Sequence, residues 1–455
     1  MVKKVWLELL LPGVLILIVG VGMMAKLGVR KAAAEEMAAG FPDRGVPRMN
    51  IALNGVALEE IKAGSKETKY EGNRLSLYER GDVKEFGDVR LKGRGNGTWT
   101  PNKKPYQIKF KEKVDLLGLG KAKKWVLLAN AMDISNLRTA TAFYLEEMLD
   151  MEYGFKGEFV ELYVDGEYEG LYYLTHAVEI GKATVDLRDP MGVLMELDNL
   201  YWNAEEYYCR SENGDYLVMK DAVDGVVAEE SMREFMRDYN EFEQAVAEKN
   251  YDRVKELVDV ESFAKYYLLS EFTVNPDAYW TSFYMYKDGV DDKIHAGPGW
   301  DFDFAFANRV WGNWMGESFY SPTQTMVRKR ELLPRESYEE MGLSGANGEV
   351  DWHSVSLSLS QIIFNMMEMP EFREKVSAIY QNKLSDRIEE LMWRLQDDVG
   401  RVAESAEKDN EKWEKGEFGD EVQMMREWIM SRYEFFEDEY SDSKGESGVE
   451  EFYVF

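Results

Sequence analysis

The sequence is poor in the side chains that bind soft metals or form disulfides. In 455 residues it has one cysteine, Cys209, and three histidines, His176, His295 and His353. An intramolecular disulfide and a Cys-x-x-Cys redox pair are therefore excluded, and a zinc site built from cysteine and histidine is not expected. We expect Cys209 to be a small packed residue. Any chemistry should then rest on carboxylates, lysines and arginines.

Basic residues are also scarce relative to acidic ones. The chain has 55 lysines and arginines against 85 aspartates and glutamates, a formal net charge of −30. A surface this acidic repels phosphate backbones, so we expect no nucleic-acid partner. Hydrophobic residues make up 45% of the chain and aromatic residues 13%. This content excludes a disordered or collagen-like chain, and the length predicts about two to four domains.

One long apolar run lies near the N-terminus. Two lysines precede a run from Val5 to Ala25 in which Glu8 is the only charged residue. Its length is close to the roughly 20 residues of a transmembrane helix and exceeds the apolar region of about 7–15 residues in a signal peptide. We therefore predict an N-terminal membrane anchor over residues 1–31. A signal cleaved near residues 32–34, which would release a secreted protein, and a buried helix are the alternatives.

The rest of the chain divides into a strand-rich part and a helix-rich part. After a linker over residues 32–48, short strands alternate with turns, including hairpin signals at Asn54-Gly55 and Asp165-Gly166. From about residue 228 helical periodicity dominates. The pattern predicts an α+β fold of two packed lobes. We place the main domain at 49–394, followed by a helical extension and acidic tail over 395–455.

A glycine-rich segment is the first candidate site. Residues 93–97 read Gly-Arg-Gly-Asn-Gly and lie between strands predicted at 88–92 and 106–110; we call this segment the glycine loop. Glycine lets backbone amides approach an anion closely, and a glycine-rich loop between strands covers the ATP phosphates in protein kinases. The spacing excludes a Rossmann or Walker motif. Gly95 and Gly97 are therefore candidate phosphate-binding residues, with a flexible hairpin turn as the alternative.

The strand after the glycine loop carries a second candidate. Apolar residues alternate with Gln107 and Lys109, which share the other face of the strand. A lysine on the strand after such a loop can neutralise the phosphates of ATP. A solvated strand face is the alternative interpretation of Lys109.

Two acidic segments make the third candidate. A predicted helix ends shortly before Asp277, a predicted hairpin follows, and Gly-Pro-Gly then leads into Trp300-Asp301-Phe302-Asp303. Kinase catalytic cores have these parts in this order; the first aspartate accepts the proton of the attacking hydroxyl and the later one holds Mg²⁺. Two carboxylates separated by one residue suit Mg²⁺ or Mn²⁺. Capped turns, or the nucleotide-sugar site of a glycosyltransferase, are the alternatives.

Taken together, these segments resemble the CotH kinase-like family, named after a bacterial spore-coat protein. The resemblance covers roughly residues 49–394. Its blocks are Arg94-Gly95-Asn96, 103–106 with Lys109, 116–118 with 121–125, Asp133 with Arg138, 165–170, 194–198 and 300–303. It implies an atypical kinase-like fold that transfers phosphate from ATP to serine or threonine of protein substrates, with Mg²⁺ or Mn²⁺. With the lysines ahead of the apolar run, it also implies an extracytoplasmic domain.

The resemblance also implies roles for individual residues. Asp277 resembles the catalytic base, Asp301 the chief metal ligand and Asp303 a second metal ligand. The phosphate-binding lysine would be Lys109 or, failing that, Lys104.

Two departures from the family pattern leave a non-catalytic relative, which binds a nucleotide or a surface partner, as the alternative function. Thr281-Ser282 occupy the stretch where many relatives have an asparagine for a second metal. His176 stands where relatives often have a glutamate that could partner the phosphate-binding lysine. Glu179 or Glu196 would have to take that place, and Glu196 is thus a further candidate cofactor-binding residue.

Overall fold

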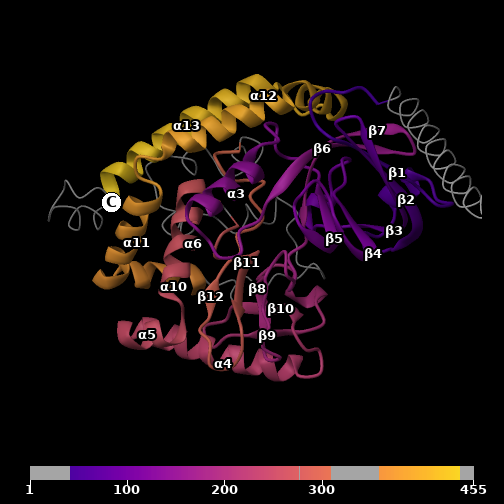
Figure 1. Ribbon diagram of the computed structural model, residues 1–455. Coiled ribbons are helices and arrows are strands. Elements are labelled where there is room, and N and C mark those ends of the chain that lie inside the picture. The colour runs from indigo at the N-terminus through magenta and orange to yellow at the C-terminus, as the bar shows by residue number, and fades with distance from the viewer. Residues whose placement is uncertain (1–40, 276, 309–357, 441–455) are drawn as a thin grey trace, which may run out of the picture.

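The computed structural model describes residues 41–275, 277–308 and 358–440. Within these ranges the N-terminal part is rich in β-strands and the C-terminal part is largely helical (Figure 1), which confirms a mixed α+β fold. The anchor expected over residues 1–31 lies outside the described ranges. Among the residues inside them, no helix combines the length and the hydropathy that a membrane span requires.

Seven strands close into a barrel. They are β1 (Arg48–Ala52), β2 (Tyr70–Glu79), β3 (Asp82–Gly93), β4 (Tyr106–Asp115), β5 (Lys121–Leu128), β6 (Gly157–Val164) and β7 (Glu167–His176). Their order around the barrel is β1-β2-β3-β4-β5-β7-β6, and parallel pairing of β1 with β6 closes it. Alternate residues such as Ile51, Ile108 and Trp125 are fully buried in the barrel core, as the period of a strand requires.

Turn chemistry explains the connections of the barrel. Asp165-Gly166 joins β6 to β7 in the predicted hairpin, with both residues at positive φ. β1 and β2 are also antiparallel neighbours, but the connection after Asn54-Gly55 is longer than a hairpin turn because it contains helix α2 (Leu58–Ala63). A short 3-10 helix, η1 (Gly97–Trp99), begins at the last residue of the glycine loop, and helix α3 (Arg138–Met148) lies between β5 and β6.

A second, antiparallel sheet lies beside the barrel (Figure 1). Its order is β12 (His295–Ala296), β11 (Phe283–Lys287), β8 (Val193–Leu197), β10 (Tyr216–Ala222) and β9 (Tyr208–Arg210), and a 3-10 turn, η2 (Trp202–Ala204), precedes β9. Helix α4 (Ala228–Ala247) packs on β8 and β10, α5 (Tyr251–Leu257) packs on α4, and α6 (Val260–Thr273) packs on β12. These elements share one large apolar core, distinct from the core of the barrel.

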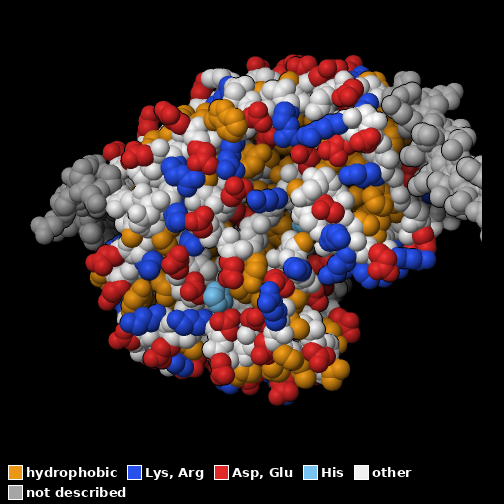
Figure 2. Space-filling view, viewed as in Figure 1, with side chains coloured by type: hydrophobic (Ala, Val, Ile, Leu, Met, Phe, Trp, Pro, Cys, Tyr) orange, Lys and Arg blue, Asp and Glu red, His pale blue; other side chains and the backbone are white. Residues whose placement is uncertain are grey.

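The C-terminal helices join both parts of the molecule. α10 (Ser358–Met367) and α11 (Pro370–Lys383) pack near α4 and α6, whereas α12 (Ile388–Trp413) contacts α3 and β7, and α13 (Phe418–Tyr440) returns along α12. α12 and α13 run side by side across the molecule in Figure 1. Residue 394, at which we placed the end of the main domain, lies inside the continuous helix α12. On the face shown in Figure 2, acidic and basic side chains are interspersed.

Candidate active site

Residues from well-separated segments line a single cavity of about 650 Å³. The barrel contributes the glycine loop and the residues that follow β5, and the second sheet contributes Glu196 of β8 and Lys220 of β10. Further parts of the wall come from segments 277–284 and 300–304, from 66–67, and from 198–205, which follows β8. The cavity therefore lies where the barrel faces the second sheet, and both parts of the fold are needed to form it.

Most of the predicted site residues meet in this cavity. Those that line it are Gly95, Gly97, Glu196, Asp277, Asp301 and Asp303. They come from four places in the sequence, so their convergence depends on the tertiary fold. Their individual roles stay predictions.

The two predicted phosphate-binding lysines are not among the residues that line the cavity. The Lys104 ammonium donates to the carbonyl of Trp99 at 2.5 Å and lies 5.1 Å from the centroid of the Trp99 ring. Lys109 pairs across the barrel sheet with Lys124 and Arg90. It lies on the strand face opposite Ile108, whose side chain fills the barrel core. The alternation in the sequence correctly places Lys109 on the strand face that points away from the barrel core. That face, however, does not contribute Lys109 to the lining of the cavity.

Lys220 is a cavity lysine that sequence reasoning missed, and Lys66 and Lys92 also line the cavity. Its ammonium lies 3.0 Å from a Glu196 carboxylate oxygen and 2.6 Å from a Glu205 carboxylate oxygen. Burial would lower the pKa of Lys220, but these two carboxylates raise it above its ordinary value. Lys220 is the extra residue of a β-bulge, because the register between β10 and β8 shifts between Met219 and Asp221. A bulge re-aims a side chain, and strand alternation in the sequence does not reveal it.

Glu179 and Glu196 are the two residues that could take the role of the glutamate that relatives carry at the position of His176. Both pair with lysines. Glu196 pairs with Lys220 in the cavity, and Glu179 lies 2.5 Å from the ammonium of Lys124. His176 itself packs against Trp125, with ring centroids 4.3 Å apart, and burial lowers its pKa. Glu196 is thus the glutamate that supplies a lysine–glutamate pair at the candidate site.

The backbone of the glycine loop requires glycine at position 95. Gly95 has a φ of +79°, and a Cβ at this position would lie 2.0 Å from the Thr98 hydroxyl oxygen. Only glycine fits there without a rearrangement. The ammonium of Lys66 donates to the carbonyl of Gly95 at 2.6 Å and also to the side chain of Asn96. The backbone of the glycine loop is therefore held at the wall of the cavity.

Arg94 connects the glycine loop to the acidic segment. Its guanidinium lies 5.5 Å from the centroid of the Trp300 ring. Burial raises the pKa of Asp301 above its ordinary value, and the positive charge of Arg94 offsets part of this increase. The two candidate segments therefore face each other across the cavity, with opposite charges between them.

Asp301 and Asp303 are separated by one residue and lie in the segment 301–308, which we call the aspartate turn. Asp301 has a φ of +65°, and its side chain accepts a hydrogen bond from the Ser282 hydroxyl at 3.1 Å. Burial and the negative charge of Asp301 raise the pKa of Asp303 to about 7. A cation between the two carboxylates would offset their repulsion.

Thr281 and Ser282, where the sequence departs from the family pattern, donate hydrogen bonds from their hydroxyls to two of the cavity carboxylates. The Thr281 hydroxyl donates to Asp198 at 3.1 Å, and the neighbouring Ser282 donates to Asp301. Burial, together with the charge of Glu196, raises the pKa of Asp198 to about 6. Asp277, four residues before Thr281, accepts the backbone N–H of Thr281 with its carbonyl at 3.2 Å. This short segment therefore supplies Asp277 to the cavity and hydroxyl donors to Asp198 and Asp301.

The carboxylate oxygens of the cavity suit a hard divalent cation that is also coordinated by a substrate phosphate. Within the ranges that the structure covers, no group of three or more histidine, cysteine, aspartate or glutamate side chains is arranged to hold a metal ion. Mg²⁺ is commonly bound by one or two protein carboxylates, with water and substrate phosphates as its other ligands. Asp301 and Asp303 supply two oxygen ligands of this kind.

A scan against protein-family models matches residues 89–436 to the family described as CotH kinase protein. The match spans the glycine loop, both acidic segments and most of α13. A search of curated proteins finds no match.

Proposed function

This chain belongs to the CotH kinase protein family, and from that premise we propose that it is a metal-dependent kinase that transfers phosphate from ATP to serine or threonine of protein substrates. One observation carries the proposal. The glycine loop, the Lys220–Glu196 pair and the acidic segments with Asp277, Asp301 and Asp303 line the same cavity. These are the parts that phosphoryl transfer needs, because its catalysis consists almost entirely of positioning and charge stabilisation.

The phosphates of ATP would lie between the glycine loop and the cations of the cavity. Backbone amides near Gly95 would donate to phosphate oxygens, since no side chain at this position blocks their approach. Lys220 and Arg94 line the same cavity and would offset the phosphate charge. Glu196 keeps the Lys220 ammonium charged and in place.

Asp301 and Asp303 would hold Mg²⁺ or Mn²⁺ through their carboxylate oxygens. The metal, when bound, neutralises charge that develops on the phosphate oxygens. Ser282 orients Asp301 by its hydrogen bond, and Asn275 donates to the Asp301 carbonyl at 3.0 Å. These contacts limit the movement of the metal-binding carboxylates before the cation arrives.

Asp277 would act on the acceptor hydroxyl. Its carboxylate would accept the hydroxyl proton as the new oxygen–phosphorus bond forms and the bond to ADP breaks. Support for this role is that Asp277 lines the same cavity as Asp301 and Asp303, and that Thr281 and Ser282, which follow it closely in sequence, donate to Asp198 and Asp301.

Purified protein incubated with labelled ATP, and in parallel with labelled nucleotide sugars, tests the proposed function, with Mg²⁺ or Mn²⁺ in each reaction. We expect label from ATP in protein serine or threonine. ATP binding without transfer would favour the non-catalytic alternative, and transfer from a nucleotide sugar would favour a glycosyltransferase.

We further propose that an N-terminal membrane helix anchors the kinase outside the cytoplasm. The support is the apolar run from Val5 to Ala25 behind two lysines. External protease added to intact cells should degrade the folded domain. A domain that is protected until the cells are lysed would contradict this location.

A further inference from the structure

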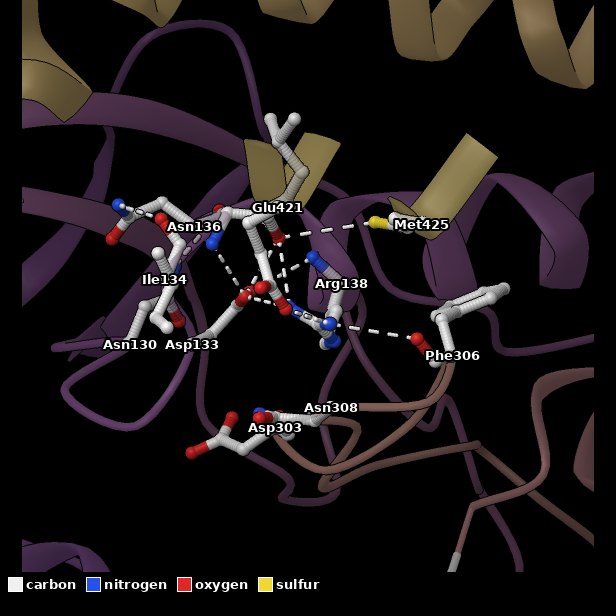
Figure 3. Close-up of polar contacts among 12 residues, drawn as sticks. Asn130, Asp133, Ile134, Asn136, Arg138, Asp303, Phe306, Asn308, Glu421 and Met425 are labelled. Carbon is white, nitrogen blue, oxygen red and sulfur yellow. Dashed lines mark hydrogen bonds and ion pairs between the residues drawn. The ribbon is translucent and has the colours of Figure 1, made fainter. Parts of the chain in front are cut away.

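A buried arginine donates hydrogen bonds to the backbone of the aspartate turn (Figure 3). Arg138, the first residue of α3, is fully buried. Its guanidinium donates to the carbonyl of Ala305 at 2.8 Å and to the carbonyl of Phe306 at 3.4 Å. These carbonyls lie two and three residues after Asp303, so the position of Arg138 bears directly on the backbone that carries the candidate metal ligands.

Two carboxylates hold this guanidinium in place. One is Asp133, which precedes α3, and the other is Glu421 of α13, whose oxygen lies 2.6 Å from the guanidinium. Burial alone would lower the pKa of Arg138, but Asp133 and Glu421 raise it above its ordinary value. The guanidinium is therefore charged, and Glu421 determines its position on the side of the C-terminal helices.

Asp133 also affects the candidate site electrostatically. Its negative charge contributes to the raised pKa of Asp303. Asn308 links the two segments, because its side-chain amide donates to the carbonyl of Met132 at 2.9 Å and to the carbonyl of Asp303 at 2.7 Å. A shift of Arg138 would change both the support of the aspartate turn and the charge balance around Asp303.

The C-terminal helices also contact the segment before α3. Asn410 of α12 donates to the carbonyl of Ile134 at 2.9 Å, and Lys415, between α12 and α13, donates to the carbonyl of Asn130 at 2.9 Å. Asn130 lines the cavity. The connection between α12 and α13 thus contacts the cavity wall at Asn130, and Glu421 provides the contact that reaches the aspartate turn through Arg138.

We propose that Glu421 is a positioning residue, which through Arg138 sets the place of the aspartate turn and therefore of Asp301 and Asp303. The expected effect on metal binding rests on the proposed function. The expected effect on the position of the aspartate turn does not. Helix α13 is then part of the kinase unit, although it begins more than one hundred residues after the aspartate turn.

The test compares Glu421→Gln with Asp398→Asn in the full chain. Asp398 is a buried carboxylate of α12 that accepts a hydrogen bond from Tyr144 of α3 at 2.7 Å. Both changes turn a buried carboxylate between the C-terminal helices and α3 into an amide. Among the described residues, Asp398 accepts hydrogen bonds from Tyr144 and Arg401 and makes none with the aspartate turn, so Asp398→Asn reports the general cost of loosening these helices.

The first readout is amide hydrogen exchange of peptides that cover residues 301–308. We expect exchange about tenfold faster in Glu421→Gln than in the wild type, and little change in Asp398→Asn. Unchanged exchange in Glu421→Gln, or equal acceleration in both variants, would overturn the proposal. If Glu421→Gln does not fold, Glu421→Asp retains the charge but shortens the side chain, and the same outcomes apply to it.

The second readout is Mn²⁺ titrated against each protein with a non-hydrolysable ATP analogue. We expect the half-saturating Mn²⁺ concentration to rise about tenfold in Glu421→Gln only, because supports of metal ligands tune metal affinity. Equal Mn²⁺ affinity in all three proteins would overturn the positioning role. A wild type that binds no analogue would refute the proposed function, and the exchange experiment would still decide the role of Glu421.

Discussion

Replacing Lys220 by methionine removes one of the positive charges that line the cavity and keeps a side chain of similar length. In the structure the Lys220 ammonium lies between Glu196 and Glu205, at 3.0 Å and 2.6 Å. The Glu196 side chain is only 7% exposed, whereas that of Glu205 is 38% exposed. The substitution therefore leaves Glu196 buried beside other carboxylates without its lysine.

The structure sets the size of both expected effects. Removing one partner of a fully buried ion pair costs about 3–5 kcal/mol, and an exposed pair contributes about 0–1 kcal/mol. Since the Lys220 side chain is 24% exposed, we expect Lys220→Met to lower the free energy of unfolding by about 1–2 kcal/mol. A lost charge-assisted contact with phosphate should weaken ATP binding about 10- to 100-fold.

The assay is calorimetric titration of Mg-ATP against folded wild type and Lys220→Met, with unfolding by urea measured in parallel. Lys104→Met and Lys109→Met are the matched controls, since neither lysine lines the cavity. We expect both controls to bind Mg-ATP like the wild type. Normal affinity in Lys220→Met together with weak binding in either control would refute the assignment of Lys220 and return the phosphate-binding role to Lys104 or Lys109.

Two further predictions concern the glycine loop and a buried acid. Gly95→Val should weaken nucleotide binding at least about tenfold with the barrel still folded, because the valine must adopt an unfavourable positive φ and its Cβ would collide with Thr98. Gly81→Val, at positive φ in open space, should leave binding unchanged, and equal binding by both variants would contradict a role for the glycine loop. Burial raises the pKa of Glu243 from 4.5 to about 7, so this group favours the folded state when protonated, and its contribution is lost as pH rises through 7. Glu243→Gln should therefore gain about 2–3 kcal/mol of unfolding free energy relative to the wild type between pH 4.5 and pH 8, measured by urea denaturation; a constant difference across that range would contradict the raised pKa.

Local signals in the sequence were sufficient for part of the fold. Asp165-Gly166 predicted the β6–β7 hairpin because turn chemistry fixes such a connection. The closure of the barrel was not predictable, since β1 and β6 pair in parallel across more than one hundred residues. Helix α2 was missed because a helix of six residues gives too short a periodic pattern.

The candidate site shows the same limit. The glycine loop and the acidic segments were found because their residues are consecutive in sequence. Lys220 was missed because a bulge determines where its side chain points, and only the pairing of β10 with β8 creates that bulge. The link from Glu421 to Arg138 joins residues 283 positions apart, and no local pattern in the sequence indicates it.

The most direct test of the kinase proposal measures transfer of labelled phosphate from ATP by wild type, Asp277→Asn and Asp301→Asn, with nucleotide binding measured on the same folded samples. We expect the wild type to transfer phosphate. Asp277→Asn should bind Mg-ATP within about threefold of the wild type but transfer none, because its role belongs to the transition state. Asp301→Asn should lose metal-dependent binding as well as transfer. Equal transfer by wild type and Asp277→Asn would contradict the proposed function.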